Sequence, residues 1–201
     1  MSIHTFGDSH ASNTISGWKN CKNIVSHHLG AILAYSIGRD KLERLDISKF
    51  DLKDGDTVVF CFGEIDCRCH IYKYITESNT YQSIINNIVD NYIEAIKINI
   101  KNCNIKLKNV CIYNVVPPVK KSNTKENKKY PYLGTDEERK SFSQYFNICL
   151  KEKCIENNFI FFDIYNKYCD EEGFLNKKLS DGNVHIKNGM YIQEFINENL
   201  I

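Results

Sequence analysis

The chain has 201 residues, a formal net charge of +1 and a sequence pI of about 7.5. This balance argues against a dominant basic surface for nucleic acid, and no apolar run approaches the roughly 20 residues needed to cross a bilayer. Nine cysteines are an odd number in a chain of this length, so we expect reduced thiols and a cytoplasmic protein instead of a disulfide framework.

Strand-like and helix-like patterns alternate along the chain. Apolar runs predict strands over residues 2–6, 23–26, 57–62, 109–116 and 159–164, the last of them as a central strand. Amphipathic spacing predicts helices over residues 81–100 and 188–198, and a capping-box pattern at 135–138 predicts the start of another. The alternation predicts an α/β fold, a three-layer α/β/α sandwich with a mostly parallel central sheet, built by residues 1–201 as a single domain.

Three polar motifs follow predicted strands or precede the last helix. Gly7-Asp8-Ser9-His10 follows the first strand, Phe62-Gly63-Glu64-Ile65-Asp66-Cys67-Arg68 follows a buried strand, and Asp181-Gly182-Asn183-Val184-His185 lies near the far end of the chain. A serine on a tight turn can act as a nucleophile when a histidine serves as its base. In a parallel sheet these distant segments can converge at the carboxyl ends of the strands.

The order and spacing of these motifs resemble the SGNH (GDSL-like) hydrolase superfamily over nearly the whole chain, with Phe62–Arg68 resembling a variant of its Gly-x-Asn-Asp block. The resemblance implies a flavodoxin-like sandwich in which Ser9 is the nucleophile, His185 the base and Asp181 the residue that orients the base. It also implies that the Ser9 amide and Gly30 stabilise the oxyanion. We expect the Gly63 block to contribute further substrate contacts through Gly63, Glu64, Asp66 and Arg68.

Two positions depart from the family pattern. Ile65 occupies the place of the oxyanion-hole asparagine, and Asp181 precedes His185 by four residues instead of three. Arg68 is a candidate to replace the missing donor, with a salt bridge to Glu64 or Asp66 as its structural alternative. Asn114 is a candidate cleft residue, with a turn-capping amide as its alternative.

Metal and cofactor signals are weak. Cys67, Cys69 and His70 carry possible zinc ligands, but Cys-x-Cys-His does not match the usual two-residue gap between ligands. The chain also carries no phosphate loop or dinucleotide fingerprint. We therefore expect no metal and no cofactor.

These motifs predict a serine-dependent carboxylic-ester hydrolase, an esterase or deacetylase, with an ester of a small molecule or glycan as its partner and neither nucleic acid nor membrane. Acylated carbohydrates are the substrate class that the resemblance implies. The alternatives are an O-acyltransferase on the same scaffold, a non-catalytic glycan-binding module, and, more distantly, a methyltransferase. Residues 120–134 form a polar insertion that is either a lid over the site or a plain surface connection.

Overall fold

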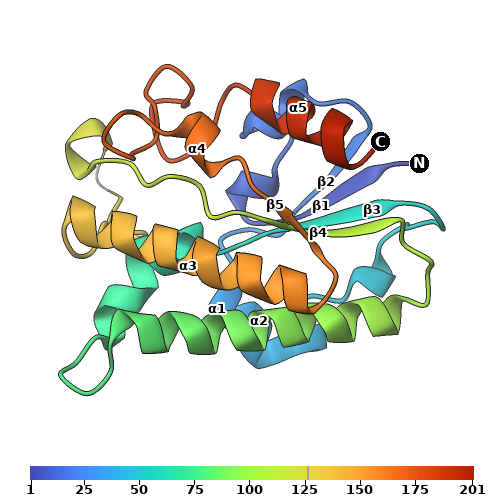
Figure 1. The fold of residues 1–201 in the computed structure, drawn as a ribbon, viewed down its shortest axis with the longest axis horizontal. Helices are drawn as coiled ribbons and strands as arrows, with labels where there is room; N and C mark the ends of the chain where they lie inside the picture. Colours follow the sequence, from blue (N-terminus) through green and yellow to red (C-terminus); the bar gives the residue numbers. More distant parts are fainter. Residues whose placement is uncertain (126) are drawn as a thin grey trace.

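A five-stranded parallel sheet forms the centre of the computed structural model, which describes residues 1–125 and 127–201 (Figure 1). Its strands stand in the order β2-β1-β3-β4-β5. Their bounds are Ile3–Gly7 (β1), Ile24–His28 (β2), Thr57–Cys61 (β3), Asn109–Tyr113 (β4) and Ile160–Phe162 (β5). The register pairs Ile3 with both Ile24 and Thr57, so that β1 to β3 end level with one another. The predicted α/β fold with a parallel sheet is confirmed.

Helices cover both faces of this sheet (Figure 1). One layer contains α1 (Ala34–Asp40), α2 (Tyr81–Cys103) and α3 (Asp136–Glu156). The other contains the short α4 (Tyr165–Tyr168) and α5 (Met190–Asn199). The segments that follow the strands therefore meet at one end of the sandwich, where the three polar motifs converge.

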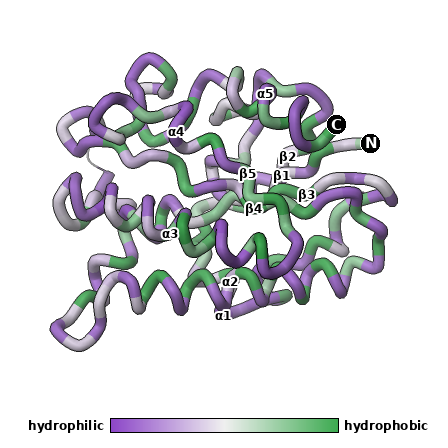
Figure 2. The backbone as a smooth tube through the Cα atoms, in the orientation of Figure 1, coloured by the Kyte–Doolittle hydropathy of each residue, from purple (hydrophilic) through white to green (hydrophobic). Residues whose placement is uncertain are grey.

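The central strand β3 shows why its apolar run is continuous. Successive side chains of a strand point to opposite faces. Val58 and Phe60 pack in the core beneath α1 to α3, whereas Val59 and Cys61 pack in the core beneath α4 and α5. A strand buried on both faces favours apolar side chains at successive positions, and the polar Thr57 at its start is hydrogen-bonded by Asn109 at 3.2 Å. In Figure 2 the hydrophobic colouring is concentrated in the interior.

The predicted capping box starts α3. The Thr135 side chain accepts a hydrogen bond from the Glu138 amide, and the Glu138 carboxylate accepts one from the Thr135 amide. Helix α2 begins at Tyr81 as predicted and continues three residues beyond the expected end at residue 100. Its C-cap is Asn104, which adopts the left-handed conformation with φ 49° that stops a helix.

Two strand predictions were wrong in detail. The strand predicted over 159–164 is β5, which is short and lies at the edge of the sheet instead of its centre. Strand order depends on the crossovers between strands, which local apolar patterning does not encode. The strand predicted to reach residue 116 ends at Tyr113, because side-chain amides take over the backbone hydrogen bonds beyond it, as when Asn147 accepts from the Val115 amide at 2.7 Å.

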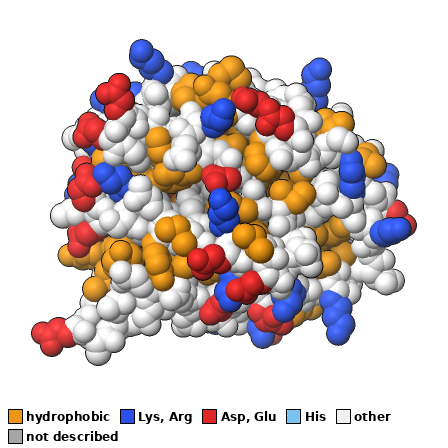
Figure 3. All heavy atoms as spheres, in the orientation of Figure 1, with side chains coloured by type: hydrophobic (Ala, Val, Ile, Leu, Met, Phe, Trp, Pro, Cys, Tyr) orange, Lys and Arg blue, Asp and Glu red, His pale blue; other side chains and the backbone are white. Residues whose placement is uncertain are grey.

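Charged side chains of both signs are interspersed on the face of the molecule drawn in Figure 3. Among the described residues, none of the helices is both long enough and apolar enough to span a membrane. The cysteines are free thiols and mostly buried, and Cys61, Cys111 and Cys149 lie in the core as small apolar groups.

Candidate active site

Ser9 stands on a tight turn directly after β1. Gly7 has no room for a side chain, because a Cβ there would overlap the carbonyl oxygen of Cys61 on the neighbouring strand. Asp8 caps the short helical turn Ser9–Ala11 by accepting a hydrogen bond from the His10 amide at 2.8 Å. The Thr5 hydroxyl ties down the end of the turn by donating to the Ala11 carbonyl at 2.7 Å. The Gly-Asp-Ser sequence thus fixes the backbone that carries the Ser9 hydroxyl.

The structure brings Ser9, His185 and Asp181 into one hydrogen-bonded line. The Ser9 Oγ lies 2.8 Å from the His185 Nε2, and the His185 Nδ1 lies 2.7 Å from the Asp181 Oδ2. A serine, a histidine and a carboxylate in this order form the arrangement in which the histidine accepts the serine proton while the carboxylate holds the ring. Residues 176 positions apart in sequence are therefore joined in a geometry suited to nucleophilic chemistry.

The four-residue spacing between Asp181 and His185 is accommodated by a closed turn. The Asp181 amide donates to the His185 carbonyl at 3.0 Å, and Gly182 takes φ 83°, a conformation that favours glycine. The Asp181 Oδ1 accepts from the amides of Asn183 and His185 at 2.8 and 3.3 Å. Its other oxygen is left facing the imidazole, so the extra residue does not displace the carboxylate.

Electrostatics favour a neutral imidazole at His185. Burial lowers the pKa of His185 below its ordinary value, and the nearby His10 lowers it further, which together outweigh the opposing effect of Asp181. The two imidazole rings lie 5.0 Å apart. For Asp181, burial favours the protonated form, but the hydrogen bond and charge of His185 and the backbone donors hold the pKa of the carboxyl below its usual range. A neutral base beside an ionised carboxylate is the protonation state that general-base catalysis needs.

A buried charged network lies next to this line. Glu64 accepts hydrogen bonds from Arg68 at 2.6 and 3.0 Å, and the His10 Nε2 lies 3.7 Å from Glu64. Burial opposes the charged form of His10, but Asp8 and Glu64 outweigh it and raise the pKa of His10. For Glu64, burial acts to raise the pKa, but Arg68 and His10 hold it well below its usual range.

The salt bridge that we considered as the structural role of Arg68 is thus present. Its guanidinium also donates to the Tyr130 carbonyl at 2.8 Å. Gly63, at the head of this block, adopts φ 118°, and a Cβ there would press against Val115. The Gly63 block is therefore a tightly built wall of the site.

Two backbone amides are free to act as oxyanion donors. Ser9 begins a helical turn and Gly30 follows β2 with φ 86°, and among the described residues neither amide has an acceptor. The space at the Gly30 Cα is open, since a Cβ placed there would meet no atom within 4 Å.

Asp66 fixes the segment that follows Gly30. Its carboxylate accepts hydrogen bonds from the amides of Ala34 and Tyr35 at 2.7 and 3.0 Å, which holds the first turn of α1 in place. The side chain is fully buried, and burial raises the pKa of Asp66 to about 7 despite the two donors. Asp66 is therefore placed to position the Gly30 loop instead of touching a substrate.

The remaining residues considered in the sequence analysis do not contribute polar groups to the site. The Asn114 side chain accepts from the Ile164 amide at 2.9 Å and donates to the Val115 carbonyl at 2.9 Å, which matches the capping alternative. Ile65 is 7 % exposed and brings no hydrogen-bond donor to the site. Within the two described ranges, no group of three or more His, Cys, Asp or Glu residues is arranged to hold a metal ion.

Comparisons of this chain with known proteins show similarity to solved structures only. No family model matches the sequence, and no curated protein matches it. Among solved structures, a GDSL-like lipase from Bacteroides thetaiotaomicron is similar with a TM-score of 0.63 and 14% identity over 98% of this chain and 86% of its own. An acetylxylan esterase from Geobacillus stearothermophilus gives 0.59 and 12% over 100% and 94%. Phospholipase A1 from Streptomyces albidoflavus gives 0.58 and 11% over 98% of each chain.

The class of fold that these similarities define is that of the SGNH (GDSL-like) hydrolases. This chain has that fold, as its sequence motifs predicted.

Two features of the site were not predicted from sequence. The first is the raised pKa of His10 beside Asp8 and Glu64, for which its position next to Ser9 was the only signal in the sequence. The second is the attachment of the polar insertion to the Gly63 block. The Leu133 amide donates to the Arg68 carbonyl at 3.1 Å, and the guanidinium carbons of Arg68 and Arg139 lie 5.3 and 5.4 Å from the centre of the Tyr132 ring. Of the insertion, residue 126 lies outside the described residues.

Proposed function

We propose that the protein is a serine-dependent carboxylic-ester hydrolase. The observation that carries this proposal is the continuous line from the Ser9 hydroxyl through the His185 ring to the Asp181 carboxylate, with hydrogen bonds of 2.8 and 2.7 Å. The fold supports it, since similar structures include a GDSL-like lipase and an acetylxylan esterase. Two structures of that esterase are described as catalytic mutants, one of a serine and one of an aspartate.

The chemistry proceeds through an acyl-enzyme. The Ser9 Oγ attacks the ester carbonyl carbon while its proton passes to the His185 Nε2, and the carbonyl oxygen becomes an oxyanion. When the tetrahedral intermediate collapses, the bond to the alcohol breaks and His185 returns the proton to the leaving oxygen. Water then attacks the acyl-serine with His185 again as base. When the bond between the acyl group and Ser9 breaks, His185 returns the proton to the Ser9 Oγ, and the carboxylic acid leaves the site.

The Ser9 and Gly30 amides are the donors for the oxyanion. Preorganised donors of this kind each contribute about 2.7–4 kcal/mol of transition-state stabilisation. Ile65 removes the third donor of the family pattern, and Arg68 is held by Glu64 and Tyr130 instead of pointing freely into the site. Two backbone amides therefore stabilise the oxyanion, and we expect a slower enzyme than one with three donors.

A glycan-binding module without catalysis is the main competing function. Such a module would have no need to keep a nucleophile, a neutral base and an orienting carboxylate in hydrogen-bonded register. An O-acyltransferase would share the acyl-enzyme and differ only in the acceptor of the acyl group. Addition of a sugar alcohol to the assay distinguishes a transferase from a hydrolase, because a transferase forms the sugar ester in preference to the free acid.

The direct test is hydrolysis of p-nitrophenyl acetate by the wild type, Ser9→Ala and His185→Ala. We expect turnover in the wild type and loss of at least a thousandfold in kcat in both variants. Equal hydrolysis by the wild type and Ser9→Ala would contradict the proposal, as would an inert wild type that is fully folded.

A further inference from the structure

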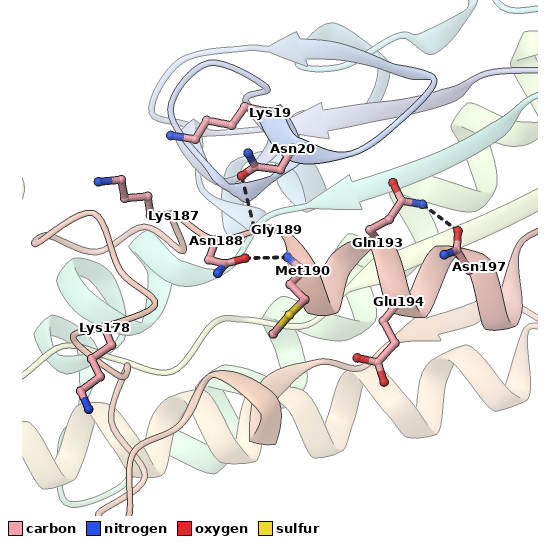
Figure 4. Close-up of a pocket in the computed structure, with 10 residues that line it drawn as sticks. All are labelled: Lys19, Asn20, Lys178, Lys187, Asn188, Gly189, Met190, Gln193, Glu194 and Asn197. Carbon is pink, nitrogen blue, oxygen red and sulfur yellow. Dashed lines mark hydrogen bonds between the residues drawn. The ribbon is translucent and has the colours of Figure 1, made fainter.

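A hollow of about 1000 Å³ lies at the start of α5, outside the Ser9–His185–Asp181 line (Figure 4). Three segments line it: the short helical turn Gly17–Asn20, the loop that leads into α5, and the first two turns of α5. This volume is at the upper end of the range of about 300–1,000 Å³ that is usual for small-molecule sites. None of the lining residues took part in the chemistry described above.

Two glycines bring these segments together. A Cβ on Gly189 would overlap the carbonyl oxygen of Gly17, and a Cβ on Gly17 would lie 3.1 Å from the Gly189 Cα. The Gly189 amide also donates to the Asn20 Oδ1 at 3.4 Å. The helical turn is therefore packed directly against the start of α5, and this backbone contact fixes the position of the hollow.

Three lysines around the hollow have no charged partner. Figure 4 shows Lys19 on the helical turn and Lys178 and Lys187 on the loop, and all three residues are exposed. Among the described residues, none of their ammonium groups has a hydrogen bond or an ion pair. The carboxylate of the lining, that of Glu194, lies 3.7 Å from the ammonium group of Lys167. The hollow therefore carries an uncompensated positive charge.

The asparagine side chains of the lining have oxygens that are already hydrogen-bonded. The Asn188 oxygen accepts from the Met190 amide at 2.9 Å. The Asn197 oxygen accepts from the Gln193 side chain at 2.8 Å, and the Asn20 oxygen accepts the backbone amide given above. Within the described part of the chain their NH2 groups have no partner, so these side chains offer donors. Ammonium and amide donors together favour a negatively charged ligand that only accepts hydrogen bonds.

Backbone hydrogen bonds hold Lys178 and Lys187 at the base of the hairpin that carries Asp181 and His185. The Lys187 amide donates to the carbonyl of Leu179, the neighbour of Lys178, at 2.8 Å. The Asp181 amide donates to the His185 carbonyl near the tip. The backbones of the two lysines are thus fixed relative to one another, and a ligand meets a preformed pair of positive charges.

A smaller hollow between α1 and α2 has a different lining. It measures about 350 Å³, and in it the His70 ring lies 4.7 Å from the Tyr35 ring and 4.7 Å from the Tyr74 ring. Its lining includes no lysine, arginine or carboxylate. Charge that selects a ligand is therefore a property of the hollow at α5.

We infer that the hollow at the start of α5 binds a small compound with two or more phosphate groups. Two phosphate groups carry a charge of about −3 to −4 at pH 7, which matches the three lysines. Ionised phosphate oxygens accept hydrogen bonds, and lysine binds phosphate as a point charge. The tetrahedral arrangement of these oxygens lets one ligand meet donors from the turn, the loop and the helix. The lining has no aromatic ring for a nucleoside base, so the phosphate groups are the recognised part.

The test is calorimetric titration with inorganic pyrophosphate at low ionic strength, where charge attraction is least screened. We expect the wild type to bind one equivalent. A double variant with Lys178→Ala and Lys187→Ala should bind about tenfold more weakly or worse, because it lacks two of the three positive charges.

Asn188→Asp is the sharper variant. Its carboxylate still accepts from the Met190 amide, which keeps the start of α5, but a donor is replaced by a negative charge. We expect binding to weaken by about tenfold or more, with a melting temperature equal to that of the wild type or higher, because a negative charge near a helix N-terminus is favourable.

The matched control combines Lys101→Ala with Lys151→Ala. Both lysines are exposed, have no ion pair among the described residues and do not line the hollow, so the control should bind pyrophosphate as the wild type does. A wild type that does not bind millimolar pyrophosphate would overturn the inference, as would a control weakened as much as the double variant. Citrate, a trianion without phosphate, bound as tightly as pyrophosphate would also overturn it.

The inference goes beyond ester hydrolysis and does not depend on it. Because the titration uses no ester, absence of pyrophosphate binding leaves the hydrolase proposal standing. A wild type that binds pyrophosphate but cleaves no ester would leave the inference standing and contradict only the hydrolase proposal.

Discussion

Replacement of Asp181 by asparagine tests the chemistry of the site with little change in shape. The Asp181 Oδ1 accepts two backbone hydrogen bonds, from Asn183 and His185. In Asp181→Asn the amide oxygen keeps that place, which forces the new NH2 group toward the His185 Nδ1. The ring must then accept at Nδ1 and carry its proton on Nε2, so it can no longer take the Ser9 proton. In a serine protease the same wrong tautomer lowers kcat by about 10⁴, or about 5.4 kcal/mol in activation free energy.

We expect a loss of about 10³ to 10⁴ in kcat for p-nitrophenyl acetate, with the melting temperature close to that of the wild type. Asp170→Asn is the matched control, because the Asp170 Oδ1 accepts from the amides two and four residues on, those of Glu172 and Phe174, in the same turn pattern away from the site. The control should keep full activity. A loss of less than tenfold in a folded Asp181→Asn variant would refute the assigned role of Asp181.

Three further predictions concern the network around the site. His10→Gln removes a positive charge that lowers the pKa of His185, so the acid limb of the kcat/KM profile should move to higher pH; a limb that stays in place or moves to lower pH would show that His10 does not act on the base. Glu64→Gln leaves the Arg68 charge buried without its partner, which should cost about 3–5 kcal/mol in urea unfolding at pH 7, and a cost below 1 kcal/mol would contradict the network. Gly63→Ala places a Cβ at φ 118° against the core, so the melting temperature should fall by several degrees, and an unchanged value would argue against strain there.

Strong local signals made much of the fold predictable. The helix predicted over 81–100 and the capping box at Thr135 follow from apolar spacing and cap chemistry that lie within a few residues of one another. The edge position of β5 was not predictable in the same way, because it depends on which crossovers the chain takes. The end of β4 depends on the Asn147 side chain, which comes from α3 and carries no mark in the strand's own sequence.

The site was predictable where the motifs carry it. Ser9, His185 and Asp181 were selected as candidates from their motifs, and the structure places them within hydrogen-bond distance of one another, while their catalytic roles stay a prediction. Asp181 lies four residues before His185, one more than in the family pattern. Its contact with the His185 ring depends on the turn at Gly182, whose geometry the sequence does not reveal.

The ring contacts that join Tyr35, His70 and Tyr74 were not predicted from sequence, for a different reason. Tyr35, His70 and Tyr74 come from two separate segments, and no spacing in the chain connects the first ring with the other two. Pairings of this kind arise only when the loops after β2 and β3 are brought together by the sheet.

The most direct measurement is to label the protein with a fluorophosphonate probe and map the modified peptide by mass spectrometry. A phosphonyl group on Ser9 in the wild type, absent from Ser9→Ala and formed far more slowly in His185→Ala, is the expected result, because only an activated serine reacts with such a probe. A wild type that stays unlabelled, or one labelled at a different residue, would contradict the assignment of Ser9 as the nucleophile of an ester hydrolase.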